Sequence, residues 1–98
     1  MTGKNPRPLS ETALTLLSLE DAARRAGLEI KYNNLEDDEM TIRSGICWLG
    51  DRRLLVVDKR LAPAQRVGVI ARALAGMNLE GIYLPPATRR IIEEAAGE

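Results

Sequence analysis

Residues 41–58, TIRSGICWLGDRRLLVVD, carry the clearest structural signal in the chain. Two runs rich in apolar and β-branched residues, 41–49 and 52–58, flank Gly50-Asp51, and glycine in a two-residue loop supplies the positive φ that a tight β-hairpin needs. The pattern therefore predicts an antiparallel hairpin. A two-residue loop also sets the register, with four expected pairs: Leu49 opposite Arg52, Trp48 opposite Arg53, Cys47 opposite Leu54, and Ile46 opposite Leu55.

This register makes two side-chain predictions. Trp48 and Arg53 should stack across the strands near the hairpin tip, in a cation–π contact of about 0.5–1 kcal/mol if exposed. Trp48 is then either a hot spot for binding or part of ordinary strand-end packing. Cys47 should be buried and unreactive, because it lies opposite Leu54 on a face that we expect to be covered.

The stretch before the hairpin predicts a helix and a strand. Ser10 can cap a helix that Gly27 ends, either continuous or broken at Ser18, and the continuous helix is favoured. Residues 28–32 then alternate apolar and polar side chains, as in an edge strand with one covered face. The expected apolar face of the helix consists of Leu14, Leu16, Leu17, Leu19, Ala22, Ala23 and Ala26.

Between this strand and the hairpin, residues 36–39, EDDE, form an acidic stretch. Four adjacent carboxylates could bind Ca²⁺, but the stretch lacks the spaced oxygen ligands and the glycine of a calcium loop. A solvated loop is the favoured interpretation.

After the hairpin, Pro63 begins a helix that ends near Gly76 and packs on the hairpin, with Gln65 and Arg72 pointing away. Its core face consists of Val67, Ile70, Ala71 and Leu74. Gly68 costs roughly 1 kcal/mol in a helix, which indicates a close approach to the sheet or another helix. Residues 77–84 form an apolar connector. Pro85-Pro86 starts a last helix, which docks through Ile91 and Ile92 and frays from Ala95.

The order of these elements predicts an α+β fold: N-terminal helix, edge strand, β-hairpin, core helix and short C-terminal helix. The sheet is expected to be small, about three-stranded, and antiparallel or mixed. The length of 98 residues suits one hydrophobic core. We therefore expect residues 1–9 to be a flexible leader and residues 10–98 to form a single domain.

Composition excludes several functions. The chain has no histidine and one cysteine, which removes Ser-His-Asp and Cys-His catalysis, His-containing zinc sites and thiolate cages. Fourteen basic residues balance fourteen acidic ones, so nucleic-acid binding is not favoured. The chain has no phosphate-binding glycine loop and no apolar run long enough for a membrane span. We expect a cytoplasmic, non-catalytic protein without a cofactor or metal.

Three stretches resemble the zincin-like domains of the ImmA/IrrE type: residues 44–58, residues 61–66 and residues 69–76. The resemblance spans roughly residues 10–76 and implies a bacterial protein with a degenerate zincin-like fold. The His-Glu-x-x-His motif of that family falls on Arg72 for the first histidine, Ala73 for the glutamate and Gly76 for the second histidine. Zinc activation of water needs those imidazoles and that carboxylate, so the resemblance implies a vestigial, non-catalytic metallopeptidase-like domain.

These observations favour a protein-interaction or self-association module. The expected surfaces are the edge strand 28–32 and the apolar connector residues Leu79, Ile82, Tyr83 and Leu84, which could instead cover the core. The alternative is a small-molecule or anion binder, or an enzyme of unrecognised chemistry, that uses Arg72 in the vestigial cleft. Residues considered for an anion or partner site are Arg72, Asp58, Trp48 and Arg53.

Overall fold

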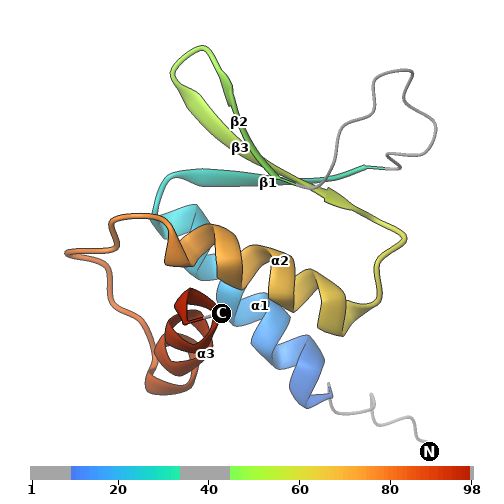
Figure 1. Cartoon of the computed structure of the whole chain (residues 1–98), viewed down its shortest axis with the longest axis vertical. Helices are drawn as coiled ribbons and strands as arrows, with labels where there is room; N and C mark the ends of the chain where they lie inside the picture. Colours follow the sequence, from blue (N-terminus) through green and yellow to red (C-terminus); the bar gives the residue numbers. More distant parts are fainter. Residues whose placement is uncertain (1–9, 34–44, 98) are drawn as a thin grey trace, which may run out of the picture.

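The computed structural model describes residues 10–33 and 45–97, and it confirms an α+β fold (Figure 1). The leader 1–9 and the acidic stretch 36–39 lie outside the described residues. The elements are α1 (Glu11–Arg25), β1 (Leu28–Asn33), β2 (Gly45–Leu49), β3 (Arg52–Asp58), α2 (Pro63–Ala75) and α3 (Pro86–Ala96).

The described strands form one sheet in the order β1-β3-β2. β2 and β3 make the expected hairpin, with Gly50 at φ 65° in its loop, and all four predicted residue pairs are present. β1 pairs with β3 in parallel, from Leu28 opposite Arg53 to Asn33 opposite Asp58. Among the described strands, β1 has a neighbour on one side only, as predicted for an edge strand over residues 28–32.

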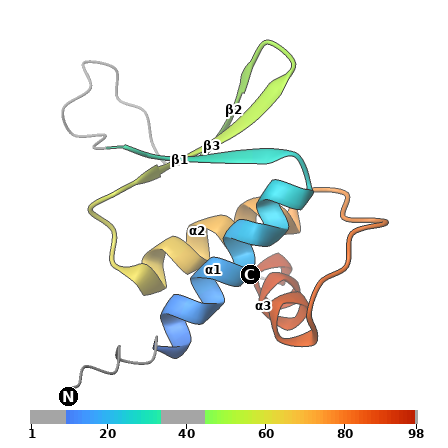
Figure 2. The same ribbon diagram turned by 180° about the vertical axis from the view of Figure 1, so that it is seen from behind.

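The three helices lie on one side of the sheet, and the hairpin extends beyond them (Figures 1 and 2). Leu55 and Val57 of β3 are almost fully buried between the sheet and the helices. The core is aliphatic, as the scarcity of aromatic residues requires. It consists of Leu19, Ala22, Ala23, Leu28, Leu55, Val57, Ile70, Ala71, Leu74, Leu84 and Ile92.

Helix α1 is continuous, as favoured, and the Ser10 hydroxyl accepts a hydrogen bond from the backbone N–H of Ala13 at 3.1 Å. Gly27 at φ 82° turns the chain from α1 into β1. The expected apolar face was too broad, because Leu14 and Leu17 are 51% and 52% exposed. α1 packs against α2, β1 and α3, and these two leucines belong neither to the core cluster nor to the partly buried residues packed against it.

Helix α2 begins at Pro63, and the Gln65 side chain accepts a hydrogen bond from the backbone N–H of Ala62 at 2.9 Å. Ile70 is fully buried, and the helix packs mainly against α1 and α3, with fewer contacts to the hairpin than expected. The prediction for Gly68 is wrong, because an added Cβ there would meet only the Arg72 guanidinium, at 3.6 Å. Among the described residues outside its own helix backbone, the three atoms nearest to that Cβ all belong to the Arg72 side chain.

The face of the hairpin that the helices cover is also not the expected one. Residues directly opposite in an antiparallel pair share a face, so Ile46 and Trp48 lie on the same face as Leu55, the helix side. Leu54 lies on the opposite face, where it is buried outside the main core cluster. The side chain of Cys47 is outside the described set, so its burial stays a prediction.

Helix α3 also differs from the prediction at its C-terminal end. It remains helical through Ala96, whereas fraying was expected from Ala95. Ile92 is buried and Ile91 is partly buried against the core, as predicted for a docked helix. Both isoleucines anchor the last turns of α3, which explains why the helix continues.

Candidate functional site

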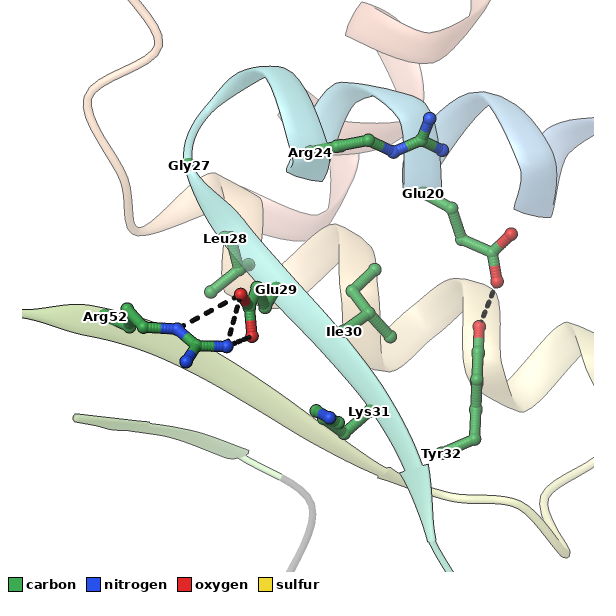
Figure 3. A pocket seen from close by; sticks show the side chains of 9 residues that line it. All are labelled: Glu20, Arg24, Gly27, Leu28, Glu29, Ile30, Lys31, Tyr32 and Arg52. Carbon is green, nitrogen blue, oxygen red and sulfur yellow. Dashed lines mark hydrogen bonds and ion pairs between the residues drawn. The ribbon is translucent and has the colours of Figure 1, made fainter. Parts of the chain in front are cut away.

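A hollow of about 730 Å³ runs along β1, with Glu20 and Arg24 of α1 and Arg52 of β3 also in its lining. We call it the β1 groove. Figure 3 shows that β1 forms its floor, while α1 contributes one wall. The lining residues are Glu20, Arg24, Gly27, Leu28, Glu29, Ile30, Lys31, Tyr32 and Arg52.

The main chain of β1 presents hydrogen-bonding groups to this groove. The Asn33 carbonyl accepts a hydrogen bond from the backbone N–H of Lys59 at 2.9 Å, so the polar groups of Asn33 point toward β3. Main-chain polar groups alternate in direction along a strand. Those of Glu29 and Lys31 therefore also point to β3, and those of Leu28, Ile30 and Tyr32 point to the open edge.

The side chains of β1 divide between its two faces in the same alternation. Leu28 is buried, and Ile30 and Tyr32 pack against the core on the helix side. Glu29 and Lys31 lie on the outer face. A strand that paired with this edge would thus meet an apolar row on one face and a charged pair on the other.

Tyr32 fastens the C-terminal half of β1 to two helices. Its hydroxyl donates a hydrogen bond to the Glu20 carboxylate of α1, and the Arg66 guanidinium of α2 lies 4.9 Å from the centre of its ring. Arg66 also donates to the Leu61 carbonyl at 3.0 Å. Burial, and then the hydrogen bond to Glu20, raise the pKa of the Tyr32 hydroxyl above its ordinary value. This end of the groove is therefore rigidly positioned.

Glu29 and Arg52 form an ion pair on the outer face, near the other end of the groove (Figure 3). The Arg52 guanidinium donates hydrogen bonds to both carboxylate oxygens of Glu29, at 2.6 Å in each case. This hydrogen bonding with Arg52 holds the pKa of Glu29 below its ordinary value, so the carboxylate is charged at neutral pH. Lys31, the next residue on this face, makes no ion pair with any described residue.

The side of α1 that borders the groove carries side chains spaced three or four residues apart. Leu17, Glu20 and Arg24 lie three or four residues apart and so share one side of α1. Leu17 is half exposed, although it is too far along the helix to line the groove itself. Glu20 and Arg24 thus present two opposite charges to anything that lies beside β1.

The residues predicted for an anion or partner site are not all brought together. Arg53 lies 5.6 Å from the centre of the Trp48 ring, which confirms the predicted stacking, and Trp48 is 67% exposed. Asp58 is at the other end of β3, five residues from Arg53 and so about 17 Å away along the strand. The Asp58 carboxylate pairs with Arg60 at 2.7 Å, and this hydrogen bonding lowers its pKa.

Arg72 is exposed on α2, and its guanidinium lies over Gly68. It does not line the β1 groove, the hollow at the connector and α3, or the small hollow beside Thr12 and Val67. Of the other two positions on which the resemblance would place the motif, Ala73 is in α2 and Gly76 follows its last residue.

The connector residues mostly cover the core. Leu84 is buried, and Leu79 and Ile82 are partly buried against the core cluster. Tyr83 is 68% exposed. The connector, with α3, also lines a smaller hollow of about 390 Å³. Of the four residues, only Tyr83 is open to a partner.

The sequence predicted residues 28–32 as an interaction surface, which stays a prediction, and it did not single out the other residues that line the β1 groove. Glu20, Arg24 and Arg52 were not among the residues predicted for a site. Arg52 reaches Glu29 because β1 pairs in parallel with β3, a long-range pairing. The alternation of Glu29 and Lys31 was the one local signal for a charged outer face.

Comparison of the chain with protein-family models, with curated proteins and with solved structures found no match. Among the residues that the structure describes, no helix combines the length and apolar content needed to cross a membrane. Within residues 10–33 and 45–97, no group of three or more His, Cys, Asp or Glu side chains is placed to hold a metal ion. The geometry of the β1 groove is therefore the main basis for a functional proposal.

Replacing Tyr32 by phenylalanine should lower the free energy of unfolding by about 1 kcal/mol at neutral pH, because the hydroxyl loses its carboxylate partner. The pKa of Tyr32 is raised in the fold, so its stabilisation is complete below pH 10.0, its ordinary pKa, and is lost as the pH rises above that value. Urea unfolding of both proteins between pH 7 and pH 11 measures the difference.

The matched control is Tyr83→Phe, which removes an exposed hydroxyl and should leave stability unchanged at neutral pH. A difference between wild type and Tyr32→Phe that stays constant up to pH 11 would contradict the assigned role of the hydrogen bond.

Proposed function

We propose that this chain is a non-catalytic protein-interaction module that binds an extended polypeptide segment along the open edge of β1. The observation that carries the proposal is that the main-chain groups of β1 that face away from β3, and pair with no other described strand, border a groove of about 730 Å³. Strand addition gains affinity from main-chain hydrogen bonds, and side-chain pockets supply specificity. An open strand edge that also borders a groove combines both.

The groove has features that suit a polypeptide better than a small ligand. It is an open trough along a strand rather than an enclosed cavity, and its polar groups are spread along its length. The fixed position of Tyr32 means that an added strand meets an ordered edge and does not have to order it first. The absence of histidine and the single cysteine support a non-enzymatic role.

The alternative function, an anion or small-molecule site at Arg72, has less support, because Arg72 does not line the β1 groove or the hollow at the connector and α3. The cytoplasmic location, the bacterial origin and the vestigial zincin-like ancestry belong to the same proposal. The single cysteine supports a reducing compartment. The missing metal ligands support a domain that works by binding.

Peptides selected on this protein from a random display library test the proposal. Selected peptides should shift the amide NMR signals of Leu28, Ile30 and Tyr32 and should lose binding to Ile30→Pro, which removes an N–H at the open edge but none of the bonds to β3. Ile30→Val keeps that N–H and is the control. Peptides that bind Ile30→Pro as well as wild type, or a selection that yields no binder, would refute strand addition at β1.

A further inference from the structure

We infer that the segment bound at the open edge of β1 is the β1 strand of a second copy of this chain. The inference rests on the proposed function, since it needs the same open edge. Its basis is the sequence of the strand itself, Leu28-Glu29-Ile30-Lys31-Tyr32, which is complementary to its own reverse in charge and in apolar pattern.

The outward main-chain groups select one register. An antiparallel pair about a two-fold axis at Ile30 places Ile30 opposite Ile30 of the second copy, and Leu28 opposite Tyr32. These are the residues whose main-chain N–H and C=O groups point to the open edge, so each opposed pair can exchange two hydrogen bonds. A shift by one residue would pair an outward residue with one that already bonds β3.

The same register matches the charges. It places Glu29 opposite Lys31 of the second copy and, by symmetry, Lys31 opposite Glu29. These are the non-hydrogen-bonded pairs of the ladder, in which side chains approach most closely. Lys31 has no ion pair with a described residue within one chain, and Glu29 is held in place by Arg52. Self-pairing thus places the Glu29 carboxylate of the second copy opposite the Lys31 ammonium group.

The helix walls agree with this arrangement. A two-fold axis through the sheet sets the two α1 helices antiparallel on the same side of the joined sheet. Their groove-facing residues Glu20 and Arg24 carry opposite charges, so antiparallel stripes bring unlike charges together. The product is a continuous sheet in the order β2-β3-β1-β1-β3-β2, in which β1 is no longer an edge.

Sedimentation equilibrium of the full chain from about 1 µM to 1 mM tests the inference, since short strand interfaces give weak association. Wild type is expected to reach twice the chain mass. Lys31→Glu and Glu29→Lys should each weaken self-association tenfold or more, because each places two like-charged pairs across the ladder. Lys59→Glu reverses an exposed lysine outside β1 and should leave the mass unchanged.

Mixing the two charge variants gives the decisive result. Lys31→Glu and Glu29→Lys chains should form a heterodimer when combined, because every cross-pair then joins Glu to Lys. Circular dichroism first shows that each variant is folded. A wild type that stays monomeric at 1 mM, or a mixture that does not associate, overturns self-pairing. If library peptides still bind β1 in that case, the proposed function stands with a different partner.

Discussion

Replacing Ile70 by alanine is expected to lower the free energy of unfolding by about 2–5 kcal/mol. Ile70 is fully buried in the middle of α2, where it belongs to the core that α1, α2 and the sheet share. Its removal leaves a cavity that close-packed neighbours fill only in part. Because a small domain is stable by only about 5–15 kcal/mol, urea titration should show a large shift of the midpoint.

Arg72→Ala is the matched control on the same helix. The arginine is exposed and contacts its own helix over Gly68, so the loss should be under about 1 kcal/mol. Equal large losses for both variants would mean that Arg72 is a structural ion. A harmless Ile70→Ala would contradict the position of the core.

Leu19→Ala should cost a similar amount, about 2–5 kcal/mol, whereas Leu14→Ala in the same helix should change stability by less than about 0.5 kcal/mol. The two substitutions are chemically identical. Leu19 has no exposed surface, and Leu14 is 51% exposed. The same urea titration applied to both variants measures the difference.

This pair tests the packing of α1 directly. Helix propensity changes equally at both positions, so only burial distinguishes them. Comparable losses at Leu14 and Leu19 would show that the outer side of α1 is covered in solution, and the exposed leucines would then be part of an interface.

Local rules predicted most of the elements. The Gly50-Asp51 loop set the hairpin register, Ser10 and Gly27 set the limits of α1, and Pro63 set the start of α2. Each of these signals acts over a few residues, through backbone conformations that the residues favour or a hydrogen bond that they supply. Such effects can be recognised without knowledge of the rest of the chain.

Long-range pairing was not accessible in the same way. The parallel contact between β1 and β3 joins Leu28 to Arg53, and no local pattern encodes it. The covered face of the hairpin follows from how the helices dock, so the apolar runs on both faces left the choice open. Periodicity likewise allowed Leu14 and Leu17 to be core residues, because it does not show how much of a helix its neighbours cover.

The strand order has a consequence for folding. The hairpin closes a two-residue loop, an event of about 1–10 µs, whereas β1 must find a partner 25 residues away in sequence. β1 is therefore expected to be the last strand added, and until it docks, the β3 edge that it will cover is open to other chains. At high protein concentration, β1 of one molecule can complete the sheet of another. Refolding at low protein concentration should therefore favour chains that complete their own sheets.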